Sequence, residues 1–343
     1  MIKTGRRNFL QALGVTGAVL TFGRPAYGVD APRPKKDPKH FHFVHVDVFT
    51  SEPLLGNPLD VFIDARGLSD VQMLALARET HLSETAFVFP RDTATELERG
   101  VSVRIFTPNG EVPFAGHPTL GTATVLRNLR LAKKARGSVA AADLAEISLD
   151  LKVGKVPVSF RSSDSGGTFG EMRQVPPTFG AQPDKETIAQ LHNLTSADIS
   201  EGGPIQIVST GLPFVIVPLK KLATLQSLRI DAEKMGAYMA GQKSNFGFYY
   251  VTRDTGDSDV ALRTRCLYVG GEDAATGSAA GCTAAWMVRY GVAAPDRSIH
   301  IRQGVEMNRA SDIFVSASRD GDKISNVRVG GYTVQTMEGE VTL

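Results

Sequence analysis

Hydrophobic and polar residues alternate along much of the chain after residue 40, and this pattern predicts a protein rich in β-strands. The first such segment, FHFVHVDVF (41–49), contains many aromatic and β-branched residues, which favour strands. Similar runs recur through the rest of the chain. The predicted strands cover residues 41–49, 59–64, 85–90, 101–107, 146–153, 155–161, 204–209, 213–219, 245–252 and 260–269, with several short runs after residue 298.

A capping box predicts the first helix. Ser69 and Gln72 stand just before the segment VQMLALARET (71–80), and at this spacing each side chain can bond the other residue's backbone N–H. The next apolar run, TAFVFP (85–90), predicts a strand. Residues 81–84 therefore connect a helix to a strand.

Two further predicted helices have opening turns that are small and apolar on every side. They cover PTLGTATVLRNL (118–129) and SAAGCTAAWMVRY (278–290), and Pro118 suits the first helical position because it has no N–H to leave unpaired. Helices that are apolar all round are usually buried, and a buried helix start leaves N–H groups that a bound anion can satisfy. Periodicity alone also allows two core helices capped by the protein itself.

The first 28 residues have the pattern of an export signal. Arg6 and Arg7 precede an apolar stretch over residues 9–22 that is short for a membrane span, and small residues follow it. The paired arginines are similar to the twin-arginine (Tat) signal, so we expect the Tat translocase to deliver the protein to the periplasm without a membrane anchor after cleavage. An ordinary amphipathic helix and a cytoplasmic protein are the alternative. Residues 29–40 form a predicted linker.

The composition is that of a globular protein without a strongly charged partner. Of the 343 residues, 42% are hydrophobic and 22% are charged, and the formal net charge is only +2. So weak a charge gives no support to nucleic-acid or lipid binding. The length predicts about two domains.

The chain has no pattern typical of a metal or nucleotide cofactor. His40, His42 and His45 lack a fourth ligand, and Cys266 and Cys282 lack the spacing of a metal site. We interpret both cysteines as packing residues. Neither a phosphate-binding loop nor a serine-hydrolase motif occurs, so we expect no metal and no cofactor.

Three titratable residues stand beside these elements. His117 follows Gly116 at the start of the first buried helix, and Asp273 precedes the second. Glu84 precedes an apolar strand, a setting that can raise a carboxyl pKa. If the two helix starts face one another, their N–H groups could hold a carboxylate while these side chains exchange protons. Spacing alone also allows a structural histidine, an N-cap aspartate and a solvent-facing glutamate.

Seven motifs occur along the chain in an order typical of one protein family. They are VDVFTSEPLLGNPLDVFID (46–64), HLSETAFVF (81–89), FTPNGEVPFAGHPTLGTA (106–123), VSTGLPFVIVPL (208–219), EDAATGSAAG (272–281), QGVEMNRASDIFV (303–315) and VGGYTVQTMEGEV (329–341). On these motifs the chain resembles the PhzF family, the phenazine-biosynthesis-like proteins of the diaminopimelate epimerase fold.

The resemblance implies an α/β (α+β) fold of two similar domains. Each would be a curved sheet or barrel wrapped round a central helix, with the ligand between the domains, in agreement with the two buried helices. We place the N-terminal domain at 41–180, with 335–343 returning to it, and the C-terminal domain at 181–334. A homodimer is the assembly that we consider.

The resemblance also implies the site residues. The glutamate of S-E-T is the catalytic acid/base of the family, so this role passes to Glu84, and His117 and Asp273 match the other two catalytic positions. We expect a small-molecule carboxylate as substrate. The residues assigned to bind it are Gly116, Thr119, Ser209, Gly277 and Ser278.

The implied reaction is a cofactor-independent isomerisation, in which a proton shifts between carbons of a small, cyclic amino or hydroxy carboxylic acid. Racemases of this fold use a pair of cysteines, but Gly116 and Asp273 stand near those places here. A thiol-based racemisation is therefore disfavoured.

The chain departs from the family pattern at three places near the site. His81 replaces the usual asparagine, Ala274 replaces the usual proline, and the stretch between residues 265 and 272 is shorter. These differences motivate an alternative function, a periplasmic small-molecule binding protein that keeps the fold and has lost turnover.

Overall fold

The computed structural model describes residues 38–135, 144–162, 168–242 and 246–343. The predicted export signal (1–28) and most of the predicted linker (29–40) lie outside the described residues. His40, the last residue of that linker, already belongs to the first strand. Among the described residues, no helix is both long and apolar enough to cross a membrane.

Strands make up most of the described structure, as the alternating pattern predicts. They are β1 (His40–Val48), β2 (Asn57–Phe62), β3 (Thr85–Phe89), β4 (Val101–Thr107), β5 (Gly110–Val112), β6 (Glu146–Leu151), β7 (Gly154–Ser162), β8 (Thr168–Arg173), β9 (Thr178–Phe179), β10 (Gln206–Ser209), β11 (Pro213–Leu219), β12 (Gly247–Thr252), β13 (Leu262–Tyr268), β14 (Gly271–Asp273), β15 (Ile299–Gln303), β16 (Ser311–Asp320) and β17 (Lys323–Thr342).

Helices are fewer, and two of them are central to the fold. The α-helices are α1 (Asp70–Thr80), α2 (Thr93–Arg99), α3 (Gly116–Ala135), α4 (Lys185–Gln190), α5 (Leu222–Ser227), α6 (Ala232–Ala240) and α7 (Gly277–Arg289). Short 3₁₀ turns occupy Ser196–Asp198 and Val305–Met307.

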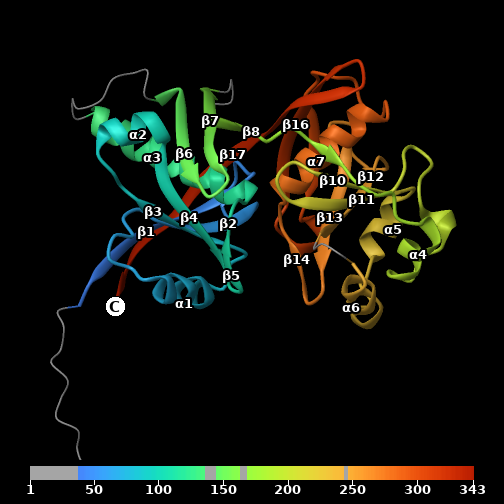
Figure 1. The fold of residues 1–343 in the computed structure, drawn as a ribbon, viewed down its shortest axis with the longest axis horizontal. Helices are drawn as coiled ribbons and strands as arrows, with labels where there is room; N and C mark the ends of the chain where they lie inside the picture. Colours follow the sequence, from blue (N-terminus) through green and yellow to red (C-terminus); the bar gives the residue numbers. More distant parts are fainter. Residues whose placement is uncertain (1–37, 136–143, 163–167, 243–245) are drawn as a thin grey trace, which may run out of the picture. The chain divides into compact units, whose positions relative to one another are not determined.

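The first group of strands closes on itself around α3. Pairing runs from β1 through β2, β3, β4, β6, β7 and β8 to β17, and β17 pairs with β1 again. Helix α3 packs against most of these strands, and Figure 1 shows it enclosed by them. This is a sheet wrapped round a central helix.

The second group of strands curves around α7. Pairing runs from β9 through β10, β11, β12, β13, β15 and β16 to the first part of β17. Helix α7 packs against β10, β11, β16 and β17, while α4, α5 and α6 lie on the outside (Figure 1). Strand β17 therefore belongs to both groups.

The two central helices are buried, as their apolar first turns predict. Every residue of α7 from Gly277 to Val288 is buried. On α3, a Cβ at Gly121 would lie 2.7 Å from Leu59 Cδ2, so the helix packs closely on β2.

Because residues 39–343 form one compact unit, the domain limits at 180 and 334 stay a prediction.

The other helices agree with the sequence pattern only in part. The predicted capping box of Ser69 and Gln72 is present on α1. Helix α3 begins two residues before Pro118 and continues to Ala135, beyond the predicted end at residue 129. Four helices of six to nine residues were not predicted, because so few turns give only a short periodic pattern; three of them begin at an aspartate N-cap.

Candidate active site

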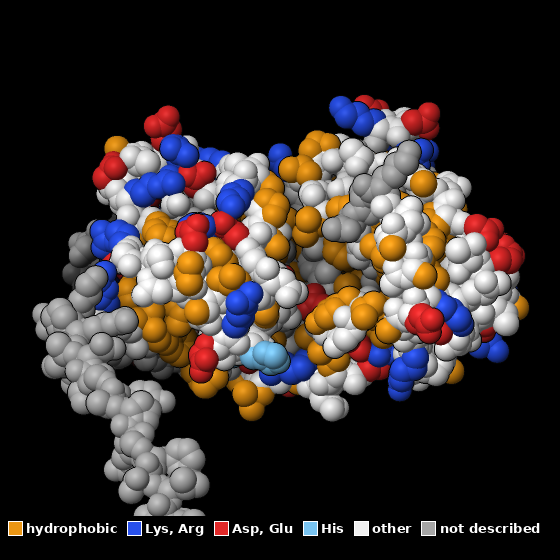
Figure 2. Space-filling view, turned by 60° about the horizontal axis from the view of Figure 1, so that its bottom comes forward, with side chains coloured by type: hydrophobic (Ala, Val, Ile, Leu, Met, Phe, Trp, Pro, Cys, Tyr) orange, Lys and Arg blue, Asp and Glu red, His pale blue; other side chains and the backbone are white. Residues whose placement is uncertain are grey.

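A cavity of about 800 Å³ lies where the two groups of strands meet. Figure 2 shows a hollow bordered by hydrophobic side chains, with an acidic side chain visible inside it. The lining comes from both groups. It includes Asn57, His81, Leu82, Ser83, Glu84, Thr107, Ala115, Gly116 and His117 from the first, and Leu212, Phe214, Cys266, Tyr268, Asp273, Gly277, Ser278, Met307 and Arg309 from the second.

The first turns of α3 and α7 meet at this cavity. A Cβ placed on Gly116 would lie 3.0 Å from both the Cα of Gly277 and the backbone nitrogen of Ser278. The sequence-based expectation that the two helix starts face one another is therefore confirmed. The close neighbour of Gly116 is the other helix, however, and a Cβ on Gly277 would lie 3.0 Å from the ring of Phe49. The structure thus requires both glycines for packing, a reason that does not depend on a ligand.

Glu84 enters the cavity from the connection between α1 and β3. Helix α1 ends at His81, whose positive φ of 55° turns the chain toward the pocket. The Glu84 side chain is 19% exposed, but its Oε2 atom is buried without a hydrogen-bond partner among the described residues. Burial raises the pKa of Glu84 to about 8, with a smaller contribution from the charge of Asp273.

His117 lies beside this carboxyl. Its Nδ1 atom is 3.7 Å from Glu84 Oε2, and the residue is only 3% exposed. Burial lowers the pKa of His117 to about 3, so the imidazole is neutral at physiological pH. A neutral imidazole does not compensate the charge of a Glu84 carboxylate.

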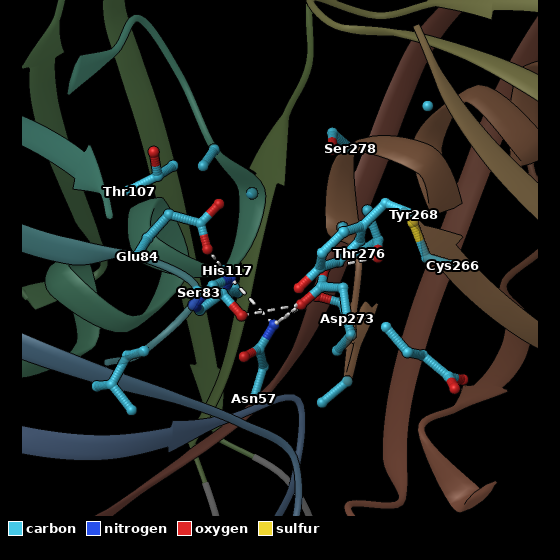
Figure 3. Close-up of a pocket in the computed structure, with 18 of the residues that line it drawn as sticks. Asn57, Ser83, Glu84, Thr107, His117, Cys266, Tyr268, Asp273, Thr276 and Ser278 are labelled. Atoms are coloured by element: carbon cyan, nitrogen blue, oxygen red, sulfur yellow. Dashed lines mark hydrogen bonds and ion pairs between the residues drawn. The ribbon is translucent and has the colours of Figure 1, made fainter. Parts of the chain in front are cut away.

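Asp273 faces these two groups from the other side of the cavity (Figure 3). Its Oδ1 accepts hydrogen bonds from Asn57 Nδ2 at 2.7 Å and from Ser83 Oγ at 3.4 Å, and its Oδ2 accepts one from Thr276 Oγ1 at 2.7 Å. Burial raises the pKa of Asp273, while these donors act in the opposite direction. Asp273 is not the N-cap of α7, because that position belongs to Thr276.

Gln303, a fully buried side chain at the end of β15, holds the segment that carries Asp273. Its Nε2 donates to the carbonyl of Asp273 at 2.8 Å and to Thr276 Oγ1 at 2.9 Å. Its Oε1 accepts from the backbone nitrogen of Thr276 and from the hydroxyl of Tyr249. The backbone just before α7 is thereby fixed from inside the sheet.

Arg309 is the arginine of the cavity lining, and its guanidinium is engaged elsewhere. It donates to the carbonyls of Gly56 and Leu54 and forms an ion pair with the buried Asp47. These contacts tie the segment after β15 to β1 and the loop that follows it. The described ion pairs include none between Arg309 and a catalytic candidate.

Two predicted substrate-binding residues do not reach the cavity. Thr119 is fully buried in α3, where its hydroxyl donates to the carbonyl of Ala115. Ser209 lies at the end of β10, and its hydroxyl accepts from the backbone nitrogen of Gly211. The structure brings the other three, Gly116, Gly277 and Ser278, to the lining.

The described residues contain no cluster of three or more histidine, cysteine or acidic side chains that could hold a metal. His40 and His42 pair with Glu340, and His45 bonds to Asp60. All three histidines lie on β1, as predicted for His42 and His45, whereas His40 was placed in the linker.

Two further lining residues were not recognised in the sequence. Asn57 is fully buried and bonds to Asp273, but in the sequence it stands between a glycine and a proline, where it carries no signal of a buried role. Tyr268 ends β13 at the edge of the cavity and is 54% exposed. Neither residue stands in a motif whose spacing indicates chemistry.

Comparison with known proteins identifies the family. The PhzC-PhzF model, described as phenazine biosynthesis-like protein, matches residues 46–339. The chain belongs to this family. It is 33% identical to a trans-2,3-dihydro-3-hydroxyanthranilate isomerase from Pseudomonas chlororaphis, over 88% of this chain and 99% of that one, and 33% identical to an uncharacterized isomerase from Mesorhizobium japonicum, over 88% and 98%.

A solved structure supports the same assignment. The PhzF-family phenazine biosynthesis protein of Bacillus anthracis has a TM-score of 0.75 and 27% identity, over 89% of this chain and all of that one. The α/β epimerase-like fold expected from the sequence is therefore confirmed. The chain is an isomerase of the PhzF family, which favours the enzyme over the binding-protein alternative.

The contact between the helix starts predicts that Gly116→Ala destabilises the protein. The added Cβ meets backbone atoms of α7, which cannot move aside as a flexible side chain can, so we expect a loss of about 1–3 kcal/mol in the free energy of unfolding, measured by urea denaturation. Gly236→Ala is the control: no atom lies within 4 Å of its Cβ position in α6, so a gain of roughly 0.5–1 kcal/mol is expected. Equal stability of the two variants would contradict the proposed contact.

The raised pKa of Glu84 predicts a pH-dependent stability. Between the ordinary value of 4.5 and about 8, the folded protein holds a proton that the unfolded chain releases, so the free energy of unfolding falls as pH rises. Relative to Glu84→Gln, the wild type should lose roughly 1 kcal/mol per pH unit in this range, measured by urea denaturation. Glu79→Gln, at an exposed position on α1, is the control: the difference in stability between the wild type and this variant should show no such trend. A wild-type-minus-Glu84→Gln difference that does not vary with pH would rule out the raised pKa.

Proposed function

We propose that the protein is a cofactor-independent isomerase in which Glu84 moves a proton between two carbons of its substrate. The observation that supports this most directly is the buried Glu84 Oε2, which has no hydrogen-bond partner among the described residues. Water and hydrogen-bond donors stabilise the charged form of a carboxylate, and this oxygen lacks both. A carboxylate in such a setting is therefore a stronger base than one in water.

The proposed step balances without a further reactant. The Glu84 carboxylate takes a proton from a C–H group next to a carbon–carbon double bond. The electron pair of that C–H bond forms a new double bond to the neighbouring carbon, and the electron pair of the old double bond takes the proton from the Glu84 carboxyl at the far carbon. Glu84 is thus regenerated, and the product is an isomer of the substrate.

The cavity suits a small carboxylic acid that also carries a hydrogen-bond donor. The first turns of α3 and α7 meet at the cavity, where their backbone N–H groups and the Ser278 hydroxyl favour an anion. Asp273 would accept a hydrogen bond from an amino or hydroxyl group of the ligand. This arrangement would hold the carbon between these groups toward Glu84.

We propose a cyclic amino or hydroxy carboxylic acid as the substrate class, with trans-2,3-dihydro-3-hydroxyanthranilate as the first candidate. The isomerase from Pseudomonas chlororaphis is named for that compound. It carries the ring, carboxylate, amino and hydroxyl groups that the site would recognise. A cavity of about 800 Å³ is within the range of small-molecule sites.

Replacing Glu84 by glutamine keeps the shape and removes the base. With trans-2,3-dihydro-3-hydroxyanthranilate and a panel of cyclic amino and hydroxy acids, we expect Glu84→Gln to lower kcat at least 10²-fold. In deuterated water the wild type should also leave deuterium in the product when Glu84 exchanges its proton with solvent before returning it. Glu79→Gln, a variant at an exposed position at the end of α1, is the control for charge loss. Wild-type turnover by Glu84→Gln on a substrate of the native enzyme would exclude Glu84 as the base.

We also propose that the enzyme is exported by the Tat translocase. The paired Arg6 and Arg7 before an apolar stretch support this proposal, and a protein that binds no cofactor needs no loading step before it folds. In a bacterial host, Arg6→Lys combined with Arg7→Lys should retain the precursor inside the cell, with the mature form shorter by about 28 residues in the wild type. Fractionation and immunoblotting measure both forms. Periplasmic recovery of the double variant at the wild-type level would refute Tat export.

A further inference from the structure

Asn57 joins the catalytic candidates of the two groups of strands. It begins β2, is fully buried and lies between His117 and Asp273 in Figure 3. Its Nδ2 atom is 2.7 Å from Asp273 Oδ1, 2.9 Å from the carbonyl oxygen of Ala275 and 3.3 Å from His117 Nδ1. One amide nitrogen therefore faces an acceptor in the second group and a ring nitrogen in the first.

The orientation of this amide follows from its neighbours. The carbonyl of Ala275 can only accept a hydrogen bond, so the atom of Asn57 that faces it must be the NH₂ group. The opposite orientation would place the amide oxygen against this carbonyl and the carboxyl of Asp273. Asn57 Oδ1 has no partner among the described residues, so it does not compete for the orientation.

The amide orientation determines the tautomer of His117. The two hydrogens of this NH₂ group face Asp273 Oδ1 and the carbonyl of Ala275, and the nitrogen cannot accept a hydrogen bond, so a proton on His117 Nδ1 directed at it would meet a donor group. We therefore assign the proton of the neutral imidazole to Nε2, which is buried without a hydrogen-bond partner among the described residues. The same unprotonated Nδ1 is the atom of His117 that stands 3.7 Å from Glu84 Oε2.

We propose that Asn57 is a positioning residue: it keeps the Nδ1 atom of His117 unprotonated, so that His117 donates no hydrogen bond to the Glu84 carboxylate. This role extends the proposed function of Glu84 as a base. A proton on Nδ1, 3.7 Å from Glu84 Oε2, would place a positive N–H group near the carboxylate, stabilise it and weaken it as a base. A lone pair on His117 Nδ1 disfavours the Glu84 carboxylate and favours the protonated carboxyl, which makes Glu84 a stronger base.

Nuclear magnetic resonance on the unliganded protein tests this role. In ¹⁵N-histidine-labelled wild type at neutral pH, the His117 signals, assigned by their loss in His117→Gln, should show an unprotonated Nδ1 and a protonated Nε2. Asn57→Asp replaces the NH₂ group by an acceptor of the same shape, so the proton should move to Nδ1. Asn57→Ala removes the donor and should give a substantial population with the proton on Nδ1. In Asn57→Ala the pKa of Glu84, followed by its ¹³C carboxyl signal, should fall by about one unit or more. Asn57→Asp reports on the tautomer alone, because the charge of a new carboxyl group would itself raise the pKa of Glu84.

Thr276→Val separates this role from an effect on Asp273 alone. Thr276 also donates to the Asp273 carboxyl, but no hydrogen bond of the described structure joins it to His117. The Thr276→Val variant should therefore leave the His117 tautomer unchanged. A wild-type His117 protonated on Nδ1 would overturn the proposal even if no Asn57 variant folded, and so would a folded Asn57→Ala with the wild-type tautomer and the wild-type Glu84 pKa. No substrate is needed, so these outcomes are independent of the turnover test of Glu84.

Discussion

The structure depends on burying two carboxyl groups in one cavity without a cation to pair with either. Glu84 and Asp273 come from different groups of strands, and the described ion pairs connect neither to a lysine or an arginine. Burial raises the pKa of both, and the charge of Asp273 raises that of Glu84 further. Asp273 is compensated by three side-chain donors, whereas Glu84 has only the neutral His117 beside it. This difference in the number of hydrogen-bond donors makes Glu84 the more basic carboxyl group. Asp273, held by its donors, acts as a fixed hydrogen-bond acceptor.

The packing of the backbone around the cavity holds the two carboxyl groups in these different surroundings. Two central helices begin at glycines whose backbones lie almost in contact, so their first turns line the cavity, while the rest of α7 is buried as far as Val288. Two side chains, one of them in the cavity lining, then fix the backbone around the cavity. Gln303 holds the segment before α7, and Arg309 with Asp47 ties the loop after β15 to β1. These contacts hold the two carboxyl groups in fixed positions. Glu84 needs such a fixed position, because its raised pKa depends on its buried surroundings.

Local patterns predicted much of this architecture, and contacts between distant residues account for what they missed. The capping box at Ser69 and the strand alternation act within a few residues, so both can be predicted from the sequence. Asn57 and Asp273 are 216 residues apart, and nothing in their spacing indicates that they bond. Family motifs pointed to Glu84, His117 and Asp273, but from the motif at 208–219 the structure brings Leu212 and Phe214 to the cavity and leaves Ser209 outside it. Burial of an individual atom, the property that distinguishes Glu84 Oε2, depends on the packing of the whole molecule.

The central claim is that Glu84 transfers the proton, and a crystal structure with a bound substrate analogue tests it most directly. An analogue of trans-2,3-dihydro-3-hydroxyanthranilate, or of another acid that the enzyme turns over, is suitable. We predict that a Glu84 oxygen lies about 3–3.5 Å from the carbon that loses its proton, with the carboxylate at the helix starts and Asp273 bonded to an amino or hydroxyl group. An analogue that fills the cavity with its reacting carbon more than one side-chain length from Glu84 would contradict the account.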